Sequence, residues 1–221
     1  MSTIFVDNVK TVSGTTTFAD GQFGGIINSS ATGTFTGTHT GTHTGSISSS
    51  ATFPAGHIIQ IAYDESSALD STSADYASTF DDTNLSASIT PTSATNYLLM
   101  HGVVNGGNSS SSYAIAFRFH ISGGGTDGVI GVPASPSGSR IAVTTGGPMP
   151  NGSHQVTNYS FMTRVRCDDS IPNWSSGVLT IKIQFARNTG GTARINEAGS
   201  APNASSYTNT ISTLTIYEIK G

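Results

Sequence analysis

A four-residue repeat, Thr-Gly-Thr-Xaa, runs through residues 32–48 and restricts the structures that this part of the chain can form. In the segment "TGTFTGTHTGTHTGSIS" the variable position holds Phe35, His39, His43 and Ile47. On an extended chain, successive side chains point to opposite faces. The glycines and the four variable residues therefore share one face, and the hydroxyl side chains form the other.

A single strand of this kind buries almost nothing and leaves its backbone polar groups without partners, so it is not stable alone in water. Three copies around one axis would stack Phe35, His39, His43 and Ile47 as rings of three, and the glycines would let the backbones approach closely. The repeat therefore predicts a thin trimeric β-shaft over residues 31–53, about 50 to 80 Å long if fully extended. The alternative is a flexible Gly/Thr linker, which has no reason to keep a strict period of four.

The two histidines raise the question of a metal ion. Three copies of His39 would form one ring and three copies of His43 a second, about 13 Å apart on extended chains. The rings are too far apart to share one ion, but each could hold a transition-metal ion through three imidazoles, with water completing the shell. Otherwise the rings are axial packing that fixes the register of the three chains. We expect no required cofactor beyond this possible axial ion.

The rest of the chain alternates apolar and polar residues with a period of two. In "VLTIKIQFAR" the apolar residues Leu179, Ile181, Ile183 and Phe185 are expected on one face, opposite Lys182 and Gln184. In "YAIAFRFHI" the residues Tyr113, Ile115, Phe117, Phe119 and Ile121 are expected on one face, and Ala114, Ala116, Arg118 and His120 on the other. No window shows the 3.6-residue apolar period of a helix. The predicted strands are His57 to Tyr63, Tyr76 to Phe80, Leu85 to Thr90, Tyr97 to Val104, Tyr113 to Ile121, Arg140 to Thr145, Val156 to Cys167, Val178 to Arg187 and Ile211 to Ile219.

Alternating strands joined by glycine-rich turns indicate an all-β chain whose residues 54–221 form an antiparallel β-sandwich of jelly-roll type. The short apolar pieces of residues 1–30 are too sparse to bury a core of their own. We therefore expect three parts: an N-terminal anchoring segment over residues 1–30, the shaft over 31–53 and the sandwich over 54–221.

Composition limits the possible partners. Charged residues are only 10% of the chain, while serine and threonine together make up 64 of 221 residues. The net charge is −4 and only nine residues are lysine or arginine, so we expect no binding to nucleic acid. The N-terminus lacks the basic start and apolar run of a signal peptide, and no apolar run approaches ~18 residues. We expect a protein made in the cytoplasm that does not insert into membranes.

Little in the sequence indicates catalysis. The adjacent acid pairs Asp64-Glu65, Asp81-Asp82 and Asp168-Asp169 fall at strand ends and in turns, where aspartate is common. No Gly-Xaa-Ser-Xaa-Gly motif is present. Cys167 is the only cysteine and is expected to be buried rather than nucleophilic. We expect Arg164 and Arg166 to pair with acids of the same or a neighbouring subunit.

Binding of carbohydrate is more plausible than catalysis. The segment "DDSIPNWSSG" places Trp174, the only tryptophan, in a turn next to Asn173. An aromatic ring flanked by amides and hydroxyls suits stacking on a sugar. The alternative is that Trp174 plugs the end of the sandwich. Tyr207, in "NASSYTNT", is a second candidate for receptor binding.

With its short N-terminus, its Gly/Thr repeat with axial histidines and its C-terminal sandwich, the chain resembles trimeric tail fibres and receptor-binding proteins of bacteriophages. The phrases "STIFVDNVKTVSGTTTF", "ATFPAGHIIQIAYDES", "LSASITPTSATNYLLMHGVV" and "YAIAFRFHISGG" are similar to those of short fibre proteins from phages of marine bacteria. The resemblance implies an N-terminus that docks on the particle and a terminal domain that meets the host surface. Histidine rings that bind iron in this family use a His-Xaa-His spacing, whereas His39 and His43 are four residues apart.

These observations lead to one expectation and two alternatives. We expect a non-enzymatic homotrimeric virion fibre, assembled in the host cytoplasm, that contacts other virion proteins through its N-terminus and a host surface glycan or protein through its sandwich. One alternative is a capsid fibre or decoration protein with the same architecture. The other is a depolymerase of surface polysaccharide.

Overall fold

The computed structural model describes residues 53–110, 113–148, 154–200 and 208–221. The described residues belong to one compact unit, Ser49–Gly221. The predicted anchoring segment lies outside the described residues, and so does the predicted shaft apart from its last residue, Phe53.

Regular structure in the described residues consists of β-strands, as the alternating pattern predicts, and includes no helix. No helix in this part of the chain is therefore long and apolar enough to cross a membrane. The strands are β1 (Ile58–Ser66), β2 (Asp70–Thr72), β3 (Asp81–Ile89), β4 (Tyr97–Asn108), β5 (Ala114–Gly123), β6 (Thr126–Ile130), β7 (Thr145–Pro148), β8 (Thr157–Arg166), β9 (Leu179–Arg187), β10 (Ala193–Ile195) and β11 (Ser212–Ile219).

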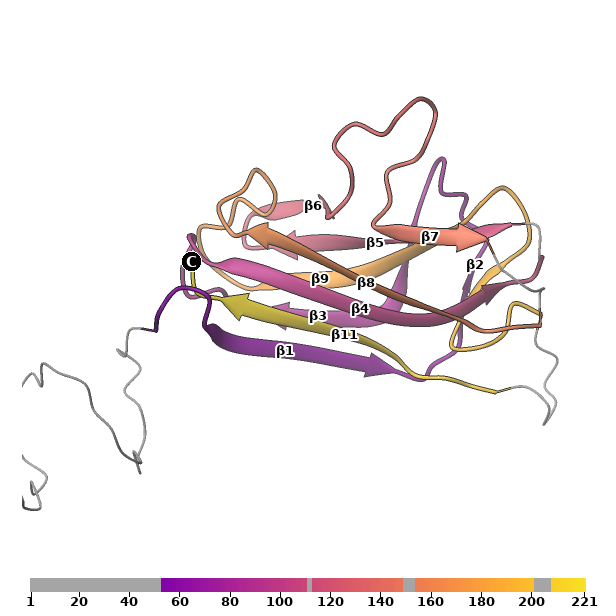
Figure 1. Ribbon diagram of the computed structural model, residues 1–221, viewed down its shortest axis with the longest axis horizontal. Coiled ribbons are helices and arrows are strands. Elements are labelled where there is room, and N and C mark those ends of the chain that lie inside the picture. Colours follow the sequence, from indigo (N-terminus) through magenta and orange to yellow (C-terminus); the bar gives the residue numbers. More distant parts are fainter. Residues whose placement is uncertain (1–52, 111–112, 149–153, 201–207) are drawn as a thin grey trace, which may run out of the picture. The chain divides into compact units, whose positions relative to one another are not determined.

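The strands form two antiparallel sheets that lie face to face (Figure 1). In the six-stranded sheet, β1 pairs with β11, β11 with β4, and β4 with β8, while the short strands β10 and β2 extend the sheet beside the end of β4. In the five-stranded sheet, β3 pairs with β9 and β9 with β5, and both β6 and β7 pair with β5. The first long strand thus lies beside the last, and the long strands β1, β3, β4, β5, β8, β9 and β11 alternate between the two sheets in chain order. This order is that of a jelly roll, which confirms the predicted sandwich.

The core between the sheets comes from the inward positions of the long strands. The predicted inward residues of β9 and the central inward residues of β5 are fully buried: Ile115, Phe117, Phe119, Ile121, Leu179, Ile181, Ile183 and Phe185. They meet aromatic residues of the facing sheet, since the rings of Phe117 and Phe119 lie 5.8 and 4.9 Å from that of Phe161. Because apolar residues occupy every second position, the remaining side chains of these strands are left for the outer face.

Two predicted strands were wrong. The segment from Tyr76 to Phe80 begins with a turn held by Asp75, whose carbonyl accepts hydrogen bonds from the backbone N–H groups of Ser78 and Thr79. The Asp75 side chain also accepts one from the Ala77 backbone, which is the local bonding that lets aspartate start turns. Residues 140–144 do not pair as a strand, and β7 begins only at Thr145.

Glu218 fixes the place where the first and last long strands meet the loop before β4. Its side chain is fully buried on β11. One carboxylate oxygen accepts hydrogen bonds from the backbone and hydroxyl of Thr92 and from Asn96, and the other accepts one from Gln60 on β1. Burial alone would raise the pKa of this carboxyl, but the hydrogen bonds outweigh burial and hold the pKa below its ordinary value. The carboxylate therefore joins β1, β11 and the loop into one network.

Replacing Glu218 tests this network. The Glu218→Gln variant places an NH₂ group against the NH₂ donor of Gln60, so the hydrogen bond between these two side chains is lost. We therefore expect the free energy of unfolding at pH 7 to fall by about 1 to 3 kcal/mol. Because the folded-state pKa is lowered, the native carboxylate stabilises the fold above the ordinary glutamate pKa of about 4.3, and this contribution is lost as the pH falls below it. Urea unfolding at pH 7 and at lower pH measures both effects. The exposed Asp127→Asn is the control, and equal stabilities of the two variants at pH 7 would contradict the prediction.

Candidate functional site

The outer face of the five-stranded sheet carries the polar side chains that the alternation excludes from the core. Arg118 and His120 on β5 face outward next to Gln184 and Lys182 on β9. Asp82 on β3 is the direct neighbour of Gln184 across the next pair of strands. One row of the sheet therefore brings a guanidinium, an amide and a carboxylate side by side.

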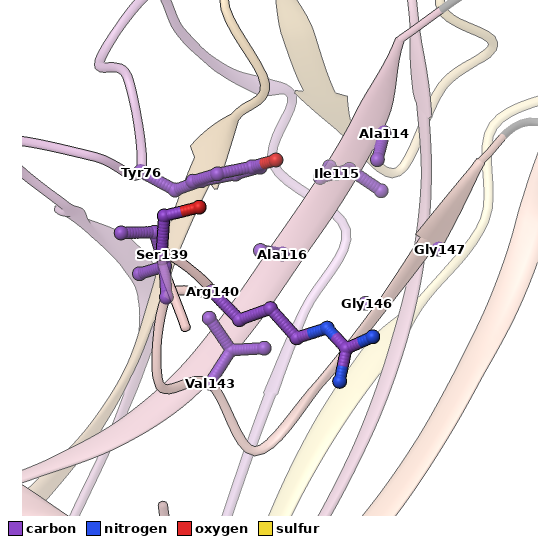
Figure 2. A pocket seen from close by; sticks show the side chains of 10 residues that line it. Tyr76, Ala114, Ile115, Ala116, Ser139, Arg140, Val143, Gly146 and Gly147 are labelled. Atoms are coloured by element: carbon purple, nitrogen blue, oxygen red, sulfur yellow. The ribbon is translucent and has the colours of Figure 1, made fainter. Parts of the chain in front are cut away.

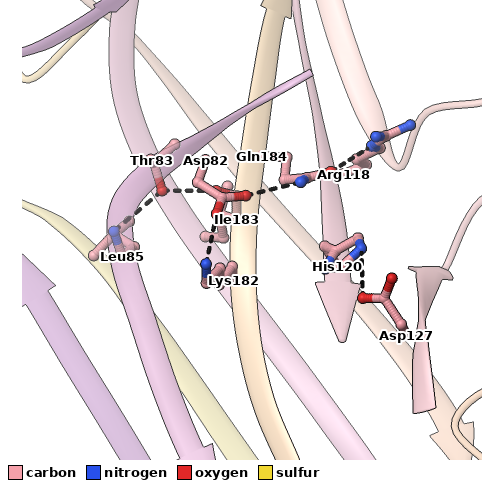
Figure 3. A network of polar contacts seen from close by, with 9 residues as sticks. All are labelled: Asp82, Thr83, Leu85, Arg118, His120, Asp127, Lys182, Ile183 and Gln184. Atoms are coloured by element: carbon pink, nitrogen blue, oxygen red, sulfur yellow. Dashed lines mark hydrogen bonds and ion pairs between the residues drawn. The ribbon is translucent and has the colours of Figure 1, made fainter. Parts of the chain in front are cut away.

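These side chains are joined by hydrogen bonds and ion pairs (Figure 3). Asp82 accepts a hydrogen bond of 2.6 Å from Lys182 and one of 2.8 Å from the amide of Gln184. The oxygen of the same amide accepts a 2.8 Å bond from Nε of Arg118. At the end of this face, Nε2 of His120 lies 3.4 Å from the Asp127 carboxylate. These bonds fix the orientation of the Gln184 amide, because its NH₂ group faces Asp82 and its oxygen faces Arg118. The terminal nitrogens of Arg118 take no part in them.

The charge state of Asp82 follows from these partners. Burial alone would raise the pKa of its carboxyl, but hydrogen bonds from Lys182 and Gln184 and the charges of Lys182 and His120 together lower it. Asp82 is therefore ionised throughout the neutral range. The carboxylate of Asp82 can therefore keep accepting hydrogen bonds from Lys182 and Gln184 below neutral pH.

Arg118 is also held by an aromatic ring. Its guanidinium carbon lies 4.0 Å from the ring centroid of Phe80, a cation–π arrangement. Phe80 follows the turn at Asp75 and is half-buried. Residues 76–80 form no strand, but they bring two aromatic side chains, Tyr76 and Phe80, to the outer face of the sheet.

A pocket of about 440 Å³ lies at the start of β5. Its lining residues come from the segment after β2, from the start of β5, from β7 and from the loop between β6 and β7: Tyr76, Ala114, Ile115, Ala116, Ser139, Arg140, Ile141, Val143, Gly146 and Gly147. Figure 2 shows Ala116 on β5 between the ring of Tyr76 and the side chain of Arg140. The pocket therefore combines small residues with an aromatic ring, a hydroxyl and a guanidinium.

Gly146 allows the two strands at the pocket to approach closely. A Cβ atom built at this position would lie 2.8 Å from the carbonyl oxygen of Ile115 and 3.2 Å from Cβ of Ala116. A larger residue would push β7 away from β5. The small residues Ala116 and Gly146 together keep the space above this part of β5 open.

The pocket lies on the half of the sandwich that is remote from the point where the described chain begins. Gly56 and Lys220 are joined by a backbone hydrogen bond, so the start of β1 and the C-terminus share one end of the sandwich (Figure 1). Ala114 is bonded to Asn188 near the opposite end. The loop between β6 and β7, which carries Arg140, projects away from the sheets (Figure 1).

Trp174 lies at the end where the described chain begins. Its backbone N–H bonds to Cys167, which in turn bonds to Asn96, and Asn96 also holds the C-terminal Gly221. The indole is half-buried against the core, and its N–H donates a 2.8 Å hydrogen bond to the carbonyl of Gly177.

This is the placement expected if Trp174 plugs the end of the sandwich. Asn173 beside it is exposed, with a positive φ of 48°. Tyr207 lies outside the described residues, as do Phe35, His39, His43 and Ile47. A receptor-binding role for Asn173, Trp174 and Tyr207 remains a prediction from the sequence.

The other residues singled out by the sequence have structural partners. Cys167 is fully buried, and burial raises the pKa of its thiol to about 12, so it is not a reactive thiolate. Arg166 pairs with Asp168 at 3.1 Å, whereas Arg164 stacks on the ring of Tyr97. Within the described residues, no three histidine, cysteine, aspartate or glutamate side chains are placed to hold a metal ion.

Sequence reasoning missed Tyr76, Ser139 and Arg140 as site residues. It placed Tyr76 and Arg140 in strands, where their outward side chains had no special role. One available signal was the segment "VPASPSGSR", whose prolines, serines and glycine indicate a long loop that ends in Arg140. Functional side chains often lie on such loops, because a rigid scaffold holds them in place.

Comparisons with solved structures find weak similarities, which include two chains from structures of one virus. A chain from the structure of infectious bursal disease virus, Gt strain, shares 13% identity at a TM-score of 0.40, covering 81% of this chain and 43% of that one. A chain from a crystal structure of a viral particle of the same virus shares 13% identity at a TM-score of 0.35, covering 81% and 40%. The present chain thus spans less than half the length of either.

At TM-scores below 0.5, these similarities assign no function. No protein-family model matches the chain, and a comparison with curated proteins finds no match. The jelly-roll order of the strands follows from their own pairing and does not depend on these comparisons.

The row Asp82–Gln184–Arg118 can be tested by one substitution. In Asp82→Asn the carboxylate that orders the Gln184 amide is lost, so we expect the Arg118 Nε–H resonance to shift in a ¹⁵N NMR spectrum. Because Lys182 and Asp82 both contact solvent, we expect the free energy of unfolding to fall by at most about 1 kcal/mol. Asp127→Asn, on the same sheet, should leave the Arg118 resonance in place. An unchanged resonance in Asp82→Asn would show that Arg118 is oriented by other contacts.

Proposed function

We propose that this chain is a structural protein of a bacteriophage virion, a homotrimeric fibre that attaches the particle to the host cell by binding surface carbohydrate. Residues 1–30 anchor it to other virion proteins, and residues 31–53 form the trimeric shaft. The sandwich, residues 54–221, presents the carbohydrate-binding surface. The protein acts in the virion, after assembly in the host cytoplasm.

The pocket beside β5 is the observation that carries the attachment role. Tyr76 offers an aromatic ring on which a sugar can stack, and Ser139 and Arg140 offer hydrogen-bond donors for its hydroxyl groups. A volume of about 440 Å³ lies within the range of small-molecule sites and is large enough for a sugar residue. The position of the pocket also fits this role, because an anchor that precedes β1 would leave the opposite half of the sandwich free to meet the host.

The composition of the pocket favours binding over cleavage. Glycoside hydrolysis requires two carboxyl groups on either side of the scissile bond. None of the described residues that line the pocket is an aspartate or a glutamate. The nearby carboxylate of Asp82 is engaged by Lys182 and Gln184. We therefore propose a binder with no enzymatic activity, and expect no new reducing ends when the protein is incubated with host polysaccharide.

Substitutions in the pocket test the attachment role. We expect Tyr76→Ala and Arg140→Ala each to weaken binding of the full-length protein to host cells or their purified surface polysaccharide by about fivefold or more, since each removes a stacking or charged contact worth about 1 to 3 kcal/mol. Fluorescence titration of labelled protein measures the change. Tyr76→Phe keeps the ring and should retain most of the affinity.

Lys220→Ala is the matched control for Arg140→Ala. It also removes one positive charge, but it lies beside the start of β1, at the opposite end of the sandwich. We expect it to bind as the native protein does. If Lys220→Ala weakens binding as much as Arg140→Ala, the effect is one of net charge and the pocket is not the receptor site.

The trimeric shaft makes a separate prediction. We expect light scattering of the full-length protein to give a mass near three times 22.7 kDa. Metal analysis of the trimer then decides between a transition-metal ion held by the histidine rings and axial packing alone. The double substitution His39→Ala and His43→Ala should abolish the bound metal, because it removes both rings of imidazoles. His154→Ala, in the sandwich, should leave it in place.

Two results would decide against parts of the shaft. A trimer without bound nickel, zinc or iron would show that the histidines serve as axial packing only. A monomeric mass would show that residues 31–53 are a linker, and with that result the fibre proposal would fail.

A further inference from the structure

The pocket at the start of β5 carries a positive charge that has no carboxylate partner. Among the described residues that line the pocket, Arg140 is the one charged side chain, and it forms no ion pair with the described part of the chain. Asp75 precedes a lining residue in the sequence, but its carboxylate accepts a hydrogen bond from the backbone of Ala77. Residues 111–112 and 149–153, which come shortly before β5 and directly after β7 in the sequence, contain no aspartate or glutamate. The charge of Arg140 is therefore available to a ligand.

The loop between β6 and β7 holds Arg140 near a fixed point on β5. The backbone N–H of Arg140 donates a hydrogen bond of 3.4 Å to the carbonyl of Ser137, which closes a turn. Gly138 in this turn has a φ of 64°, a conformation that glycine adopts readily. Further along the loop, the backbone N–H of Thr144 donates to the carbonyl of Phe117 and ties the loop to β5. The fold thus presents the Arg140 side chain at the pocket from a closed turn.

A second guanidinium lies further along the same face of β5. Arg118 is the next outward residue after Ala116, about 7 Å along the strand. Its Nε bonds to Gln184 and its guanidinium lies over Phe80, while no carboxylate of the described residues is within ion-pair distance. Burial lowers the pKa of this guanidinium, although the charge of Asp82 acts in the opposite direction. A cation that has lost part of its water is stabilised by an anion nearby. An anion at the start of β5 would therefore be attracted by two guanidinium groups.

The groups in the pocket suit a sugar that carries an anionic group. A guanidinium presents two parallel N–H donors, which match two oxygens of a carboxylate or another oxyanion. The ring of Tyr76 offers a stacking surface, and the hydroxyl of Ser139 can exchange hydrogen bonds with those of a sugar. A neutral sugar could use the same ring and hydroxyl, but it would leave Arg140 without a counter-charge. Charge complementarity therefore favours an acidic sugar over a neutral one of similar size.

We propose that the pocket binds an acidic sugar of a surface polysaccharide, one that carries a carboxylate or a sulfate group, and that Arg140 pairs with this anionic group. Arg118 adds positive charge on the side of the pocket toward the middle of β5. This inference rests on the proposed attachment function and names the class of carbohydrate that its site takes.

Chemical removal of the anionic groups from the polysaccharide tests this inference. The polysaccharide is purified from the surface of host cells, and one portion is carboxyl-reduced, which turns each carboxylate into a neutral alcohol. A second portion is desulfated. We expect the full-length protein to bind one of these two products about tenfold or more weakly than the untreated polysaccharide, because a charge-assisted pair is lost. Fluorescence titration of labelled protein measures the affinities, and the product that binds weakly tells a carboxylate from a sulfate.

Substitution of Arg140 shows whether this preference arises in the pocket. We expect Arg140→Gln to bind the untreated and the treated polysaccharides with nearly equal affinity, since the variant keeps hydrogen-bond donors but lacks the charge. Arg140→Lys keeps the charge without the paired donors and should retain part of the preference.

Arg164→Gln is the matched control. It removes an exposed guanidinium from the outer face of the six-stranded sheet, where Arg164 stacks on Tyr97. This variant should keep the full preference for the untreated polysaccharide. Circular dichroism melting confirms that the variants are folded.

The outcomes separate this inference from the proposed attachment function. A preference that Arg140→Gln removes and Arg164→Gln keeps supports both. Equal binding of the native protein to the untreated and to both treated polysaccharides overturns the acidic sugar and leaves attachment through carbohydrate standing. A preference of full size in Arg140→Gln also overturns the inference, because the anion is then bound elsewhere. Binding to host cells without binding to their polysaccharide would indicate a protein receptor and would overturn the carbohydrate in both proposals, and a protein that does not bind host cells overturns attachment itself.

Discussion

The packing of one sheet on the other is the interaction on which the rest of this structure depends. Phe117 and Phe119 from β5 meet Phe161 from β8, and the inward residues of β9 complete the same layer. Burying side chains of this size contributes about 1.5 to 3 kcal/mol each, far more than any single polar contact on the surface. Because strand side chains alternate strictly, this layer also decides which residues remain outside. The outward polar row at Arg118 and the exposed apolar side chains of Ile61 and Tyr63 are both consequences of it.

A second constraint is local to the end of the sandwich where the described chain begins. Glu218 is a buried carboxylate that is stable because its four hydrogen bonds replace the water it has lost. Those bonds join β1, β11 and the loop before β4, and the backbone pair of Gly56 and Lys220 lies beside them. Trp174 closes the same end by packing on the core. Side-chain and backbone hydrogen bonds together with core packing therefore hold the two chain segments that meet at this end.

The sequence predicted the sandwich because the alternation of apolar and polar residues directly marks which side chains of a strand are buried. Every residue that the pattern placed inward is buried from Ile115 to Ile121 in β5 and from Leu179 to Phe185 in β9. The outward positions of Arg118, His120, Lys182 and Gln184 follow from the same alternation. The pocket could not be predicted in this way. Tyr76 and Arg140 reach it from segments whose alternation is weak, and their positions depend on a turn at Asp75 and on the loop between β6 and β7. Pairing partners far apart in sequence, such as β3 with β9, decide such positions, and one sequence alone does not reveal them.

The two outer faces of the sandwich differ in the side chains that they expose. On the five-stranded sheet, the row Asp82–Gln184–Arg118 keeps its polar groups paired. On the six-stranded sheet, Ile61, Tyr217 and Leu99 place apolar side chains next to one another in a single row. One alternating pattern produces both faces, since a jelly roll buries only the inner face of each sheet and leaves the outer faces free to differ.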